Sequence, residues 1–310
     1  MELQKVLVIV GPTASGKSAL GVALARKFKG EVISADSRQV YKGLNIGTGK
    51  ITKKEMRGVP HHLLDIVSPK RKFSAGDYAK AARKVSSTIW LHTRLPIVVG
   101  GTGYYIDSLL GRIAFPDVAP NRALRGKLQK KSAAQLYALL TKRDPRRAKA
   151  MSTPSERNNK VRLIRALEIA AAKPRLKTAK LSLQCDALWI GIAPDFKMLE
   201  KNIRSRLSAR INAGMIAEGK RLREAGVSFK RMEELGLEYR SLARLLQNKI
   251  SREEFEEELY RDIRRYAKKQ LAYWKRNKEI RWFDPASKSI EPVVRKWLST
   301  TPYVSVGKAR

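Results

Sequence analysis

The chain has 310 residues, enough for one large or two modest domains with a buried core, and 43% of them are hydrophobic, as in an ordinary globular protein. Its 65 Lys and Arg residues against 28 Asp and Glu give a net charge of +37, which favours a polyanionic partner, most often nucleic acid, over a mere effect on solubility. The single cysteine, Cys185, excludes an internal disulfide and a cysteine-based zinc site. No signal peptide and no apolar span of ~18 residues is present, so we expect a cytoplasmic protein that does not enter a membrane.

A phosphate-binding motif follows the first predicted strand. The apolar run at residues 6–10 suits a buried parallel strand, residues 19–28 have helical composition, and the pattern G-x-x-x-x-G-K-[ST] stands between them. Its glycines let backbone N–H groups ring an anion at a helix N-terminus, Lys17 adds a full charge, and Ser18 can hold a magnesium ion. We therefore expect a ligand with two or more linked phosphates at Gly11, Pro12, Thr13, Ala14, Ser15, Gly16, Lys17 and Ser18.

An acidic residue is expected beside that motif. A second strand at residues 31–34 carries Asp36 to the edge of the sheet where ligands bind in open α/β folds. In a small-molecule kinase an aspartate here could bind metal or the acceptor hydroxyl, and in another transferase it could be a base. A helix cap is the simplest alternative.

Glycines end the third predicted strand. A helix is predicted over residues 73–94, capped by Ser74 or Asp77, and a strand at 97–99 then runs into a Gly-Gly-Thr-Gly sequence at 100–103. Nucleotide hydrolases carry an aspartate at the end of such a strand, so ATP hydrolysis is disfavoured. We expect the glycines to let a second molecule approach the backbone. His61 and His62 lack a third ligand at a suitable spacing, so no metal site is predicted there.

A helical insertion is predicted after Pro116 and Pro120. Helices at 121–131, 133–141, 145–151 and 158–172 follow one another without strands, and a strand returns at residue 188. Arg162, Arg165 and Glu168 share one helical face, which is either a solvated salt-bridged face or a clamp on an RNA backbone.

The last third is predicted to be helical at 195–224, 232–247 and 252–276, with a short strand at 281–283. Tyr266, Gln270, Tyr273 and Trp274 fall together on one helix, where aromatic side chains serve the core more often than they stack on bases. The fold class is α/β: a P-loop-type parallel sheet flanked by helices, with a helical insertion domain and a helical C-terminal part. The predicted parts are the first part of the core at 1–115, the insertion at 116–186, the rest of the core at 187–300 and a basic tail at 301–310.

Seven short segments, taken together and in this order, resemble the tRNA dimethylallyltransferase (isopentenyltransferase) family over nearly the whole chain. They are the phosphate-binding motif, Ser-Ala-Asp-Ser at 34–37, Tyr-Lys-Gly-Leu-Asn-Ile-Gly-Thr at 41–48, His-His-Leu-Leu-Asp at 61–65, Val-Gly-Gly-Thr at 99–102, Arg-Ala-Leu-Glu at 165–168 and Gln-Leu-Ala-Tyr-Trp at 270–274. The resemblance implies transfer of a five-carbon group from dimethylallyl diphosphate to N6 of the adenine 3′ of the tRNA anticodon, with Mg²⁺ bound near Ser18. It implies Asp36 as the base, with Thr13, Lys17 and, in place of a family arginine, Lys220 assisting.

The resemblance also implies contacts with tRNA, whose target base must be flipped into the site. The anticodon stem-loop is the expected partner, gripped by the insertion, and we expect a monomer. The implied tRNA-binding residues are Asp36, Ser37, Arg38, Gln39, Thr102, Arg125, Asn159, Lys160, Val161, Arg162, Leu163, Leu235, Gly236, Leu237, Glu238, Tyr239 and Arg240.

Three other functions remain open from the residues alone. The phosphate-binding motif and Asp36 would also suit a kinase of a small metabolite or nucleotide, although the charge of +37 and the glycine-rich strand end do not favour it. A non-catalytic RNA-binding protein that senses a nucleotide would share the motif and the charge. An isopentenyltransferase acting on free adenine nucleotides would share the chemistry.

Overall fold

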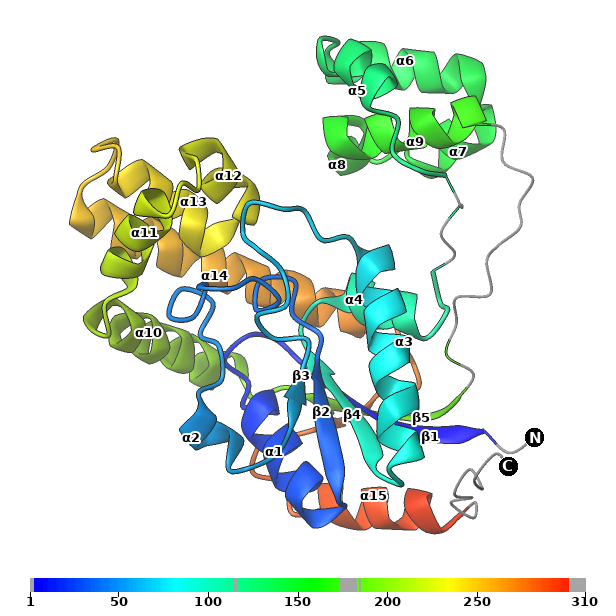
Figure 1. Ribbon diagram of the computed structural model, residues 1–310, viewed down its shortest axis with the longest axis vertical. Coiled ribbons are helices and arrows are strands. Elements are labelled where there is room, and N and C mark those ends of the chain that lie inside the picture. The colour runs from blue at the N-terminus through cyan, green and yellow to red at the C-terminus, as the bar shows by residue number, and fades with distance from the viewer. Residues whose placement is uncertain (1–2, 114–115, 117, 173–182, 184, 301–310) are drawn as a thin grey trace. The chain divides into compact units, whose positions relative to one another are not determined.

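A sheet of six parallel strands forms the centre of the computed structural model, which describes residues 3–113, 116, 118–172, 183 and 185–300 (Figure 1). The strand order is β3-β2-β4-β1-β5-β6. All the pairs are parallel, with Val8 of β1 opposite Val98 of β4 on one side and Trp189 of β5 on the other. The strands are β1 (Gln4–Val10), β2 (Gly30–Ser34), β3 (His61–His62), β4 (Leu95–Gly100), β5 (Cys185–Ile192) and β6 (Arg281–Phe283).

Helices cover both faces of the sheet, because alternate side chains of each strand point to opposite faces and both sets are apolar. Leu7 and Ile9 of β1 belong to the core with α1 and α15. Val6 and Val8 belong to a larger core with α3, α4 and the helices that follow β5. These helices are α1 (Lys17–Lys27), α2 (Lys53–Met56), α3 (Ala75–Leu91), α4 (Gly103–Leu109), α10 (Phe196–Asn212), α11 (Met215–Glu224), α12 (Phe229–Leu235), α13 (Leu237–Leu245), α14 (Arg252–Trp274) and α15 (Ile290–Ser299).

The predicted strands are confirmed, as are the helices predicted over 73–94 and 252–276, whereas two other long predicted helices are each broken in two. Ser74 caps α3 and forms a capping box with Asp77, so both predicted residues take part. The single helix predicted over 195–224 is wrong, because Gly214 adopts φ 96° and separates α10 from α11. The helix predicted over 232–247 is likewise two helices, α12 and α13, which meet at Gly236. Helices α2, α4 and α15 were not predicted.

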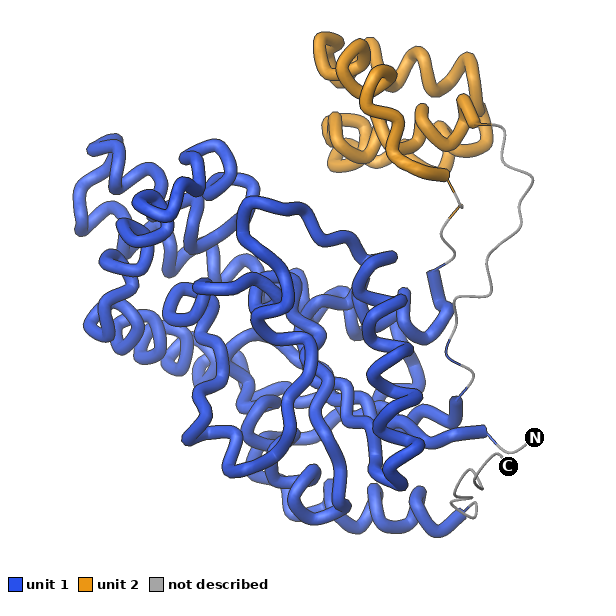
Figure 2. Tube along the Cα trace, in the orientation of Figure 1, with its two compact units in different colours: residues 1–113, 182–310 blue, residues 114–181 orange. Residues whose placement is uncertain are grey.

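The insertion forms a compact unit of its own at residues 114–181, distinct from the unit that residues 1–113 and 182–310 make (Figure 2). It consists of α5 (Arg122–Gln129), α6 (Ala133–Arg143), α7 (Pro145–Ala150), α8 (Pro154–Arg157) and α9 (Lys160–Ala172). Leu136, Leu140 and Leu163, each fully buried, are at the centre of its separate hydrophobic core. The predicted basic tail at 301–310 lies outside the described residues.

The glycines that end β4 admit another part of the same chain. A Cβ atom on Gly101 would come well inside 3.0 Å of the Gln270 carboxamide, and one on Gly103 equally close to the Tyr273 ring. Both partners belong to α14. The space that we expected a second molecule to use at these two glycines is therefore filled by α14, and only Gly100 of this group lines the cavity described below.

Within the described part of the chain, no helix combines the length and the apolar character that crossing a bilayer requires.

The packing of α14 on Gly101 predicts a loss of stability in Gly101→Ala. The added methyl group must displace Gln270, and overpacking of this kind costs about 1–3 kcal/mol of unfolding free energy. Gly126→Ala is the matched control, because a Cβ there meets no atom within 4 Å and the residue lies inside a helix. The control should gain about 0.5–1 kcal/mol. Urea unfolding followed by circular dichroism measures both, and equal stability of the two variants would contradict the packing argument.

Candidate active site

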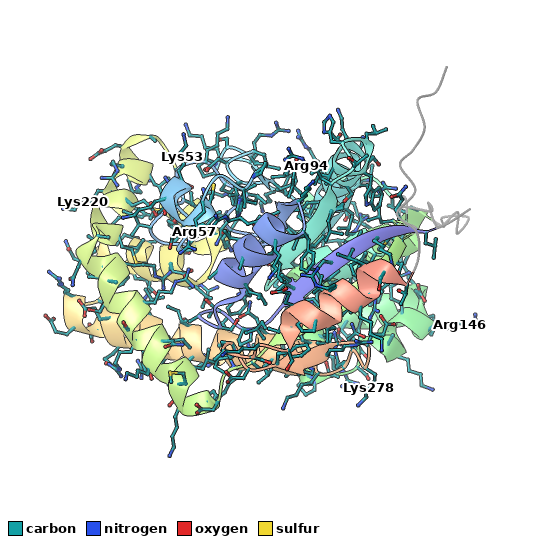
Figure 3. All side chains as sticks on the ribbon, turned by 90° about the horizontal axis from the view of Figure 1, so that it is seen from below. Lys53, Arg57, Arg94, Arg146, Lys220 and Lys278 are labelled. Carbon is teal, nitrogen blue, oxygen red and sulfur yellow. The ribbon has the colours of Figure 1, made fainter. Side chains whose placement is uncertain are left out.

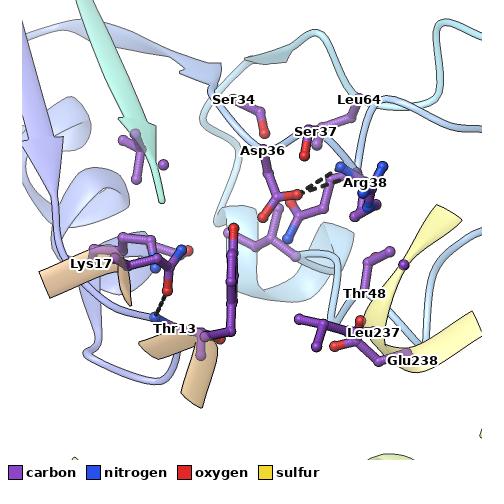
Figure 4. A pocket seen from close by; sticks show the side chains of 18 of the residues that line it. Thr13, Lys17, Ser34, Asp36, Ser37, Arg38, Thr48, Leu64, Leu237 and Glu238 are labelled. Atoms are coloured by element: carbon purple, nitrogen blue, oxygen red, sulfur yellow. Dashed lines mark hydrogen bonds between the residues drawn. The ribbon is translucent and has the colours of Figure 1, made fainter. Parts of the chain in front are cut away.

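A cavity of about 240 Å³ opens at the carboxyl ends of β2 and β4 and beside the phosphate-binding motif (Figure 4). This is the edge at which open parallel sheets bind ligands. The structure brings eleven of the 26 predicted site residues to this one cavity. The predicted residues that line it are Thr13, Lys17, Ser18, Asp36, Ser37, Arg38, Gln39, Gly236, Leu237, Glu238 and Arg240.

The phosphate-binding loop connects β1 to α1 and leaves its polar groups available. Gly16, at φ 86°, caps α1 without a side-chain hydrogen bond to the first turn of the helix. The Ser15 hydroxyl is buried and has no hydrogen-bond partner among the residues described. Lys17 Nζ donates to the carbonyl oxygen of Pro12 at 2.9 Å, within its own loop. Such a set of unfilled donors at a helix N-terminus suits an anion.

Among the charged residues that line this cavity, Lys17 and Arg206 are close enough to affect each other, and Asp36 lies near both. The pKa of Lys17 is lowered to about 8, chiefly by burial and also by the neighbouring Arg206, while Asp36 opposes the shift. Burial also lowers the pKa of Arg206, with Arg210 as the next cause. The Arg206 guanidinium donates to the carbonyl oxygen of Gly49 at 2.8 Å. A multiply charged anion would relieve this repulsion, which is the electrostatic basis for ligand binding here.

Asp36 caps its own turn, and its role as a base stays a prediction. Its Oδ1 atom accepts hydrogen bonds from the backbone N–H of Arg38 at 2.8 Å and of Gln39 at 3.4 Å, so it does cap a turn. Its other oxygen makes none of the hydrogen bonds found among the described residues. Asp36 and Lys17 approach the cavity from two sides (Figure 4). A carboxylate fixed by one oxygen can present the other to a proton donor in the cavity.

Residues of α14 and α4 support these groups. Gln270 accepts from the Thr13 N–H at 2.8 Å and donates to the Gly101 carbonyl oxygen at 3.0 Å, which ties the phosphate-binding loop to the end of β4. Thr102 is not part of the cavity lining; its hydroxyl accepts from the Ser37 N–H at 3.0 Å. Tyr266 lines the cavity, and burial raises its pKa to about 12, so its hydroxyl stays protonated.

The segment at 235–240 divides into two sets. Gly236, Leu237, Glu238 and Arg240 reach the cavity, as noted above. Leu235 and Tyr239 are 1% and 0% exposed and belong to the hydrophobic core. Their side chains are closed off from any RNA, which corrects the expectation that they contact it.

The predicted residues of the insertion also divide by exposure. Val161 is 79% exposed, and the side chain of Arg162 is 61% exposed. Leu163 is fully buried in the core of the insertion, so it cannot serve as an RNA contact. Asn159 accepts from the Arg162 N–H at 3.1 Å at the start of α9, and exposed Lys160 donates to the Gln129 carbonyl oxygen.

A buried carboxylate binds Arg125 and Arg165 of the insertion. Arg125 donates two hydrogen bonds, both 2.7 Å long, to the fully buried carboxylate of Glu168. Arg165 donates to Glu168 and to the Val118 carbonyl oxygen. Arg125 and Arg165 therefore have a structural partner in Glu168, and their contact with RNA stays a prediction.

Lys220 does not reach the cavity. It is exposed on α11 and lies at the outside of the molecule (Figure 3). Arg206 of α10, which the sequence reasoning missed, lines the cavity instead. The sequence did contain a pattern that could have indicated Arg206. Arg206 directly precedes Leu207, and Arg210 directly precedes Ile211. Leu207 and Ile211 belong to the apolar stripe of α10, so both arginines border the buried face of this helix.

The described residues contain no group of three or more His, Cys, Asp or Glu side chains arranged to hold a metal ion. His62 Nε2 lies 2.6 Å from a carboxylate oxygen of Glu31, and His61 Nδ1 lies 2.9 Å from the Val59 carbonyl oxygen. The two histidines thus have hydrogen-bond partners within the protein.

Comparisons with known proteins agree with this geometry. The family model described as IPP transferase matches residues 39–277. A tRNA dimethylallyltransferase from Carboxydothermus hydrogenoformans is 40% identical over 308 residues, which cover 94% of this chain and 96% of that protein. The solved structure of the full-length tRNA isopentenylpyrophosphate transferase from Bacillus halodurans is 34% identical with a TM-score of 0.69, and the match covers 95% of this chain and 94% of that one. A eukaryotic dimethylallyltransferase acting on tRNA is 26% identical with a TM-score of 0.82 over 96% of this chain and 80% of its own.

The lowered pKa of Lys17 predicts how ligand binding depends on pH. Below pH 8 the amine is charged and binds an anion well, and above pH 8 the free protein loses this charge, so the affinity for a diphosphate monoester should fall. The ligand should restore the proton, giving net proton uptake at pH 8.5. Calorimetric titrations in two buffers of different ionisation enthalpy measure that uptake. Lys17→Arg should abolish the fall, because a guanidinium stays charged. Constant affinity of the unaltered protein from pH 7 to 9.5 would contradict this prediction.

Proposed function

The chain belongs to the IPP transferase family and is a prenyltransferase acting on tRNA, and we propose the following reaction in detail. The dimethylallyl group moves from dimethylallyl diphosphate to N6 of the adenine 3′-adjacent to the anticodon, tRNA position 37. The bond between C1 of the group and the diphosphate oxygen breaks, and a bond between C1 and N6 forms. N6 loses a proton, and diphosphate leaves.

The arrangement of the phosphate-binding loop, Lys17 and Arg206 opposite an available carboxylate oxygen carries this proposal. The N–H groups of the phosphate-binding loop, Lys17 and Arg206 surround the place where negative charge would develop on the leaving diphosphate. Preorganised donors of this kind stabilise the transition state more than the ground state. Arg206 thereby takes the role that the sequence reasoning gave to Lys220.

Asp36 is the proposed base. An exocyclic amine is a weak nucleophile, so a carboxylate that orients it and accepts its proton accelerates the attack. The hydrogen bonds from Arg38 and Gln39 hold one oxygen of Asp36, and the other can receive the N6 proton. Thr13, in the loop and on the cavity wall, can reach the bridging oxygen or the amine.

The residues present fit a Mg²⁺ ion that the diphosphate itself helps to hold. Mg²⁺ prefers oxygen ligands and usually binds through substrate phosphates and water with few protein groups. Ser18 supplies an exposed hydroxyl at the cavity, directly after Lys17, which suits this mode. When bound, the ion would neutralise part of the charge on the leaving group.

The acceptor adenine reaches the cavity if the nucleotide is flipped out of the anticodon loop. Ser37, Arg38 and Gln39 would line its path on one side, and the cavity-facing residues of 236–240 on the other. Exposed Lys160, Val161 and Arg162 of α9 are the proposed contacts of the insertion with the anticodon stem-loop. The substrate is tRNA, so we infer a cytoplasmic protein, and we propose that it acts as a monomer.

Mass spectrometry of the modified nucleoside tests this function. Transfer of a dimethylallyl group to tRNA adds ~68 Da, whereas a kinase would add ~80 Da to its substrate. The purified protein, tRNA and dimethylallyl diphosphate should give the ~68 Da adenosine product over many turnovers. Competition with AMP separates the two kinds of acceptor, and preference for AMP over an anticodon stem-loop would overturn the proposed substrate.

Asp36→Asn should lower turnover by ~100-fold or more, because it removes the base. The amide oxygen can still accept the two turn hydrogen bonds, so folding and tRNA binding should be nearly intact. Asp284→Asn is the matched control. Asp284 also caps a turn, because its carboxylate accepts from the Ala286 N–H at 2.9 Å, but it is not part of the cavity lining. Single-turnover rates at saturating donor measure the effect. Near-normal turnover of Asp36→Asn would show that the base is another group.

A further inference from the structure

A buried carboxylate on α11 lies behind the cavity wall. Glu218 is 3% exposed. Its Oε2 accepts from the backbone N–H groups of Asn45 at 2.9 Å and Ile46 at 2.7 Å. Its Oε1 accepts from the N–H of Gly47 at 2.9 Å and from the Tyr239 hydroxyl at 2.7 Å. Four donors on two oxygens compensate the charge that burial removes from water.

This arrangement needs a carboxylate. Three consecutive backbone N–H groups point at one anion, which requires residues 45–47 to curl around it. A glutamine of the same shape has one accepting oxygen, and its NH₂ group would face donors. Since unmet buried donors are costly, the segment would move to other partners.

The held segment in turn orients two arginines. The carbonyl oxygen of Gly49 accepts from Arg206 at 2.8 Å, and that of Gly47 accepts from Arg210 at 2.7 Å. Thr48, between these two glycines, lines the cavity. A Cβ on Gly49 would come within 3.0 Å of the Arg206 guanidinium, so there is little free space between the segment and the arginine.

Glu218 also holds the other wall of the cavity. Tyr239, which donates to Glu218 Oε1, lies on α13. Its neighbour Glu238 faces the cavity and forms an ion pair with Arg210 at 3.3 Å. One carboxylate therefore links the segment that orients Arg206 to the helix that carries the proposed acceptor-side residues.

We propose that Glu218 is a positioning residue for the transfer reaction: by holding residues 45–49 it sets the Arg206 guanidinium against the diphosphate. This inference rests on the proposed function and extends it to a residue outside the cavity. Displacing a charge-stabilising group by about 1 Å can cost ~100-fold in rate. We expect Glu218→Gln to lower kcat by ~10-fold to 100-fold.

The first experiment compares Glu218→Gln with Glu224→Gln, an exposed glutamate on the same helix. Steady-state transfer of the dimethylallyl group to tRNA gives kcat and the KM for each substrate, and filter binding gives tRNA affinity. The loss in Glu218→Gln should lie in kcat and the donor KM, with tRNA affinity within ~2-fold of the unaltered protein, and Glu224→Gln should match that protein throughout. Weaker tRNA binding with unchanged kcat would overturn the proposal.

A double-mutant cycle with Arg206→Ala tests whether Glu218 acts through Arg206. In the Arg206→Ala background, Glu218→Gln should cost less than ~2-fold further in kcat, since the group it positions is gone. Losses that multiply would overturn the proposal and return Glu218 to a purely structural role.

Tyr239→Phe disturbs the Glu218 site less, and it tests the same proposal if Glu218→Gln does not fold. It removes one of the four hydrogen bonds and leaves a ring of nearly the same size in the core. A few-fold loss of kcat that disappears in the Arg206→Ala background is expected. An unchanged kcat, or a loss that persists there, would overturn the proposal. Failure of the proposed function looks different, because the unaltered protein itself would then form no dimethylallyl-tRNA.

Discussion

The repulsion between two positive charges at the edge of the buried sheet is the interaction that the rest of the site must accommodate. Lys17 and Arg206 face one cavity, and their mutual repulsion adds to the burial that lowers the pKa of the lysine. Rigid cores on both faces of the sheet keep the two elements in place despite this repulsion. A site with this concentration of positive charge suits a polyanion, and the proposed chemistry of a leaving diphosphate would use the same feature.

Other residues of the site hold the two positively charged side chains in place. Gln270 fixes the loop that carries Lys17, and the segment around Glu218 fixes Arg206. Asp36 stands across the cavity, with one oxygen engaged by its own turn. Lys17 and Asp36 are thus held by different elements. Lys17 lies where the loop after β1 enters α1, and Asp36 lies in the turn after β2. Strands β1 and β2 both end at the same edge of the sheet.

Much of the fold and part of the site could be predicted from the sequence, because they depend on local patterns. The apolar runs of the buried strands, the phosphate-binding motif and the capping box of α3 are each contained in a few consecutive residues. Arg206 was missed because its place at the cavity depends on where α10 packs, which no short motif shows. Tyr239 and Leu163 were taken as RNA contacts because a motif does not reveal which side of a helix faces the core. Within the helices, Gly214 and Gly236 acted as breaks that helical periodicity alone did not indicate.

The bond between the Thr13 N–H and Gln270 joins residues that are 257 positions apart. During synthesis on the ribosome the phosphate-binding loop emerges near the start and must wait for α14 before it is tied to the end of β4. An incomplete nascent chain therefore has an early loop without its late partner. A chain that ends before Gln270 therefore lacks the hydrogen bonds that tie the phosphate-binding loop to the end of β4.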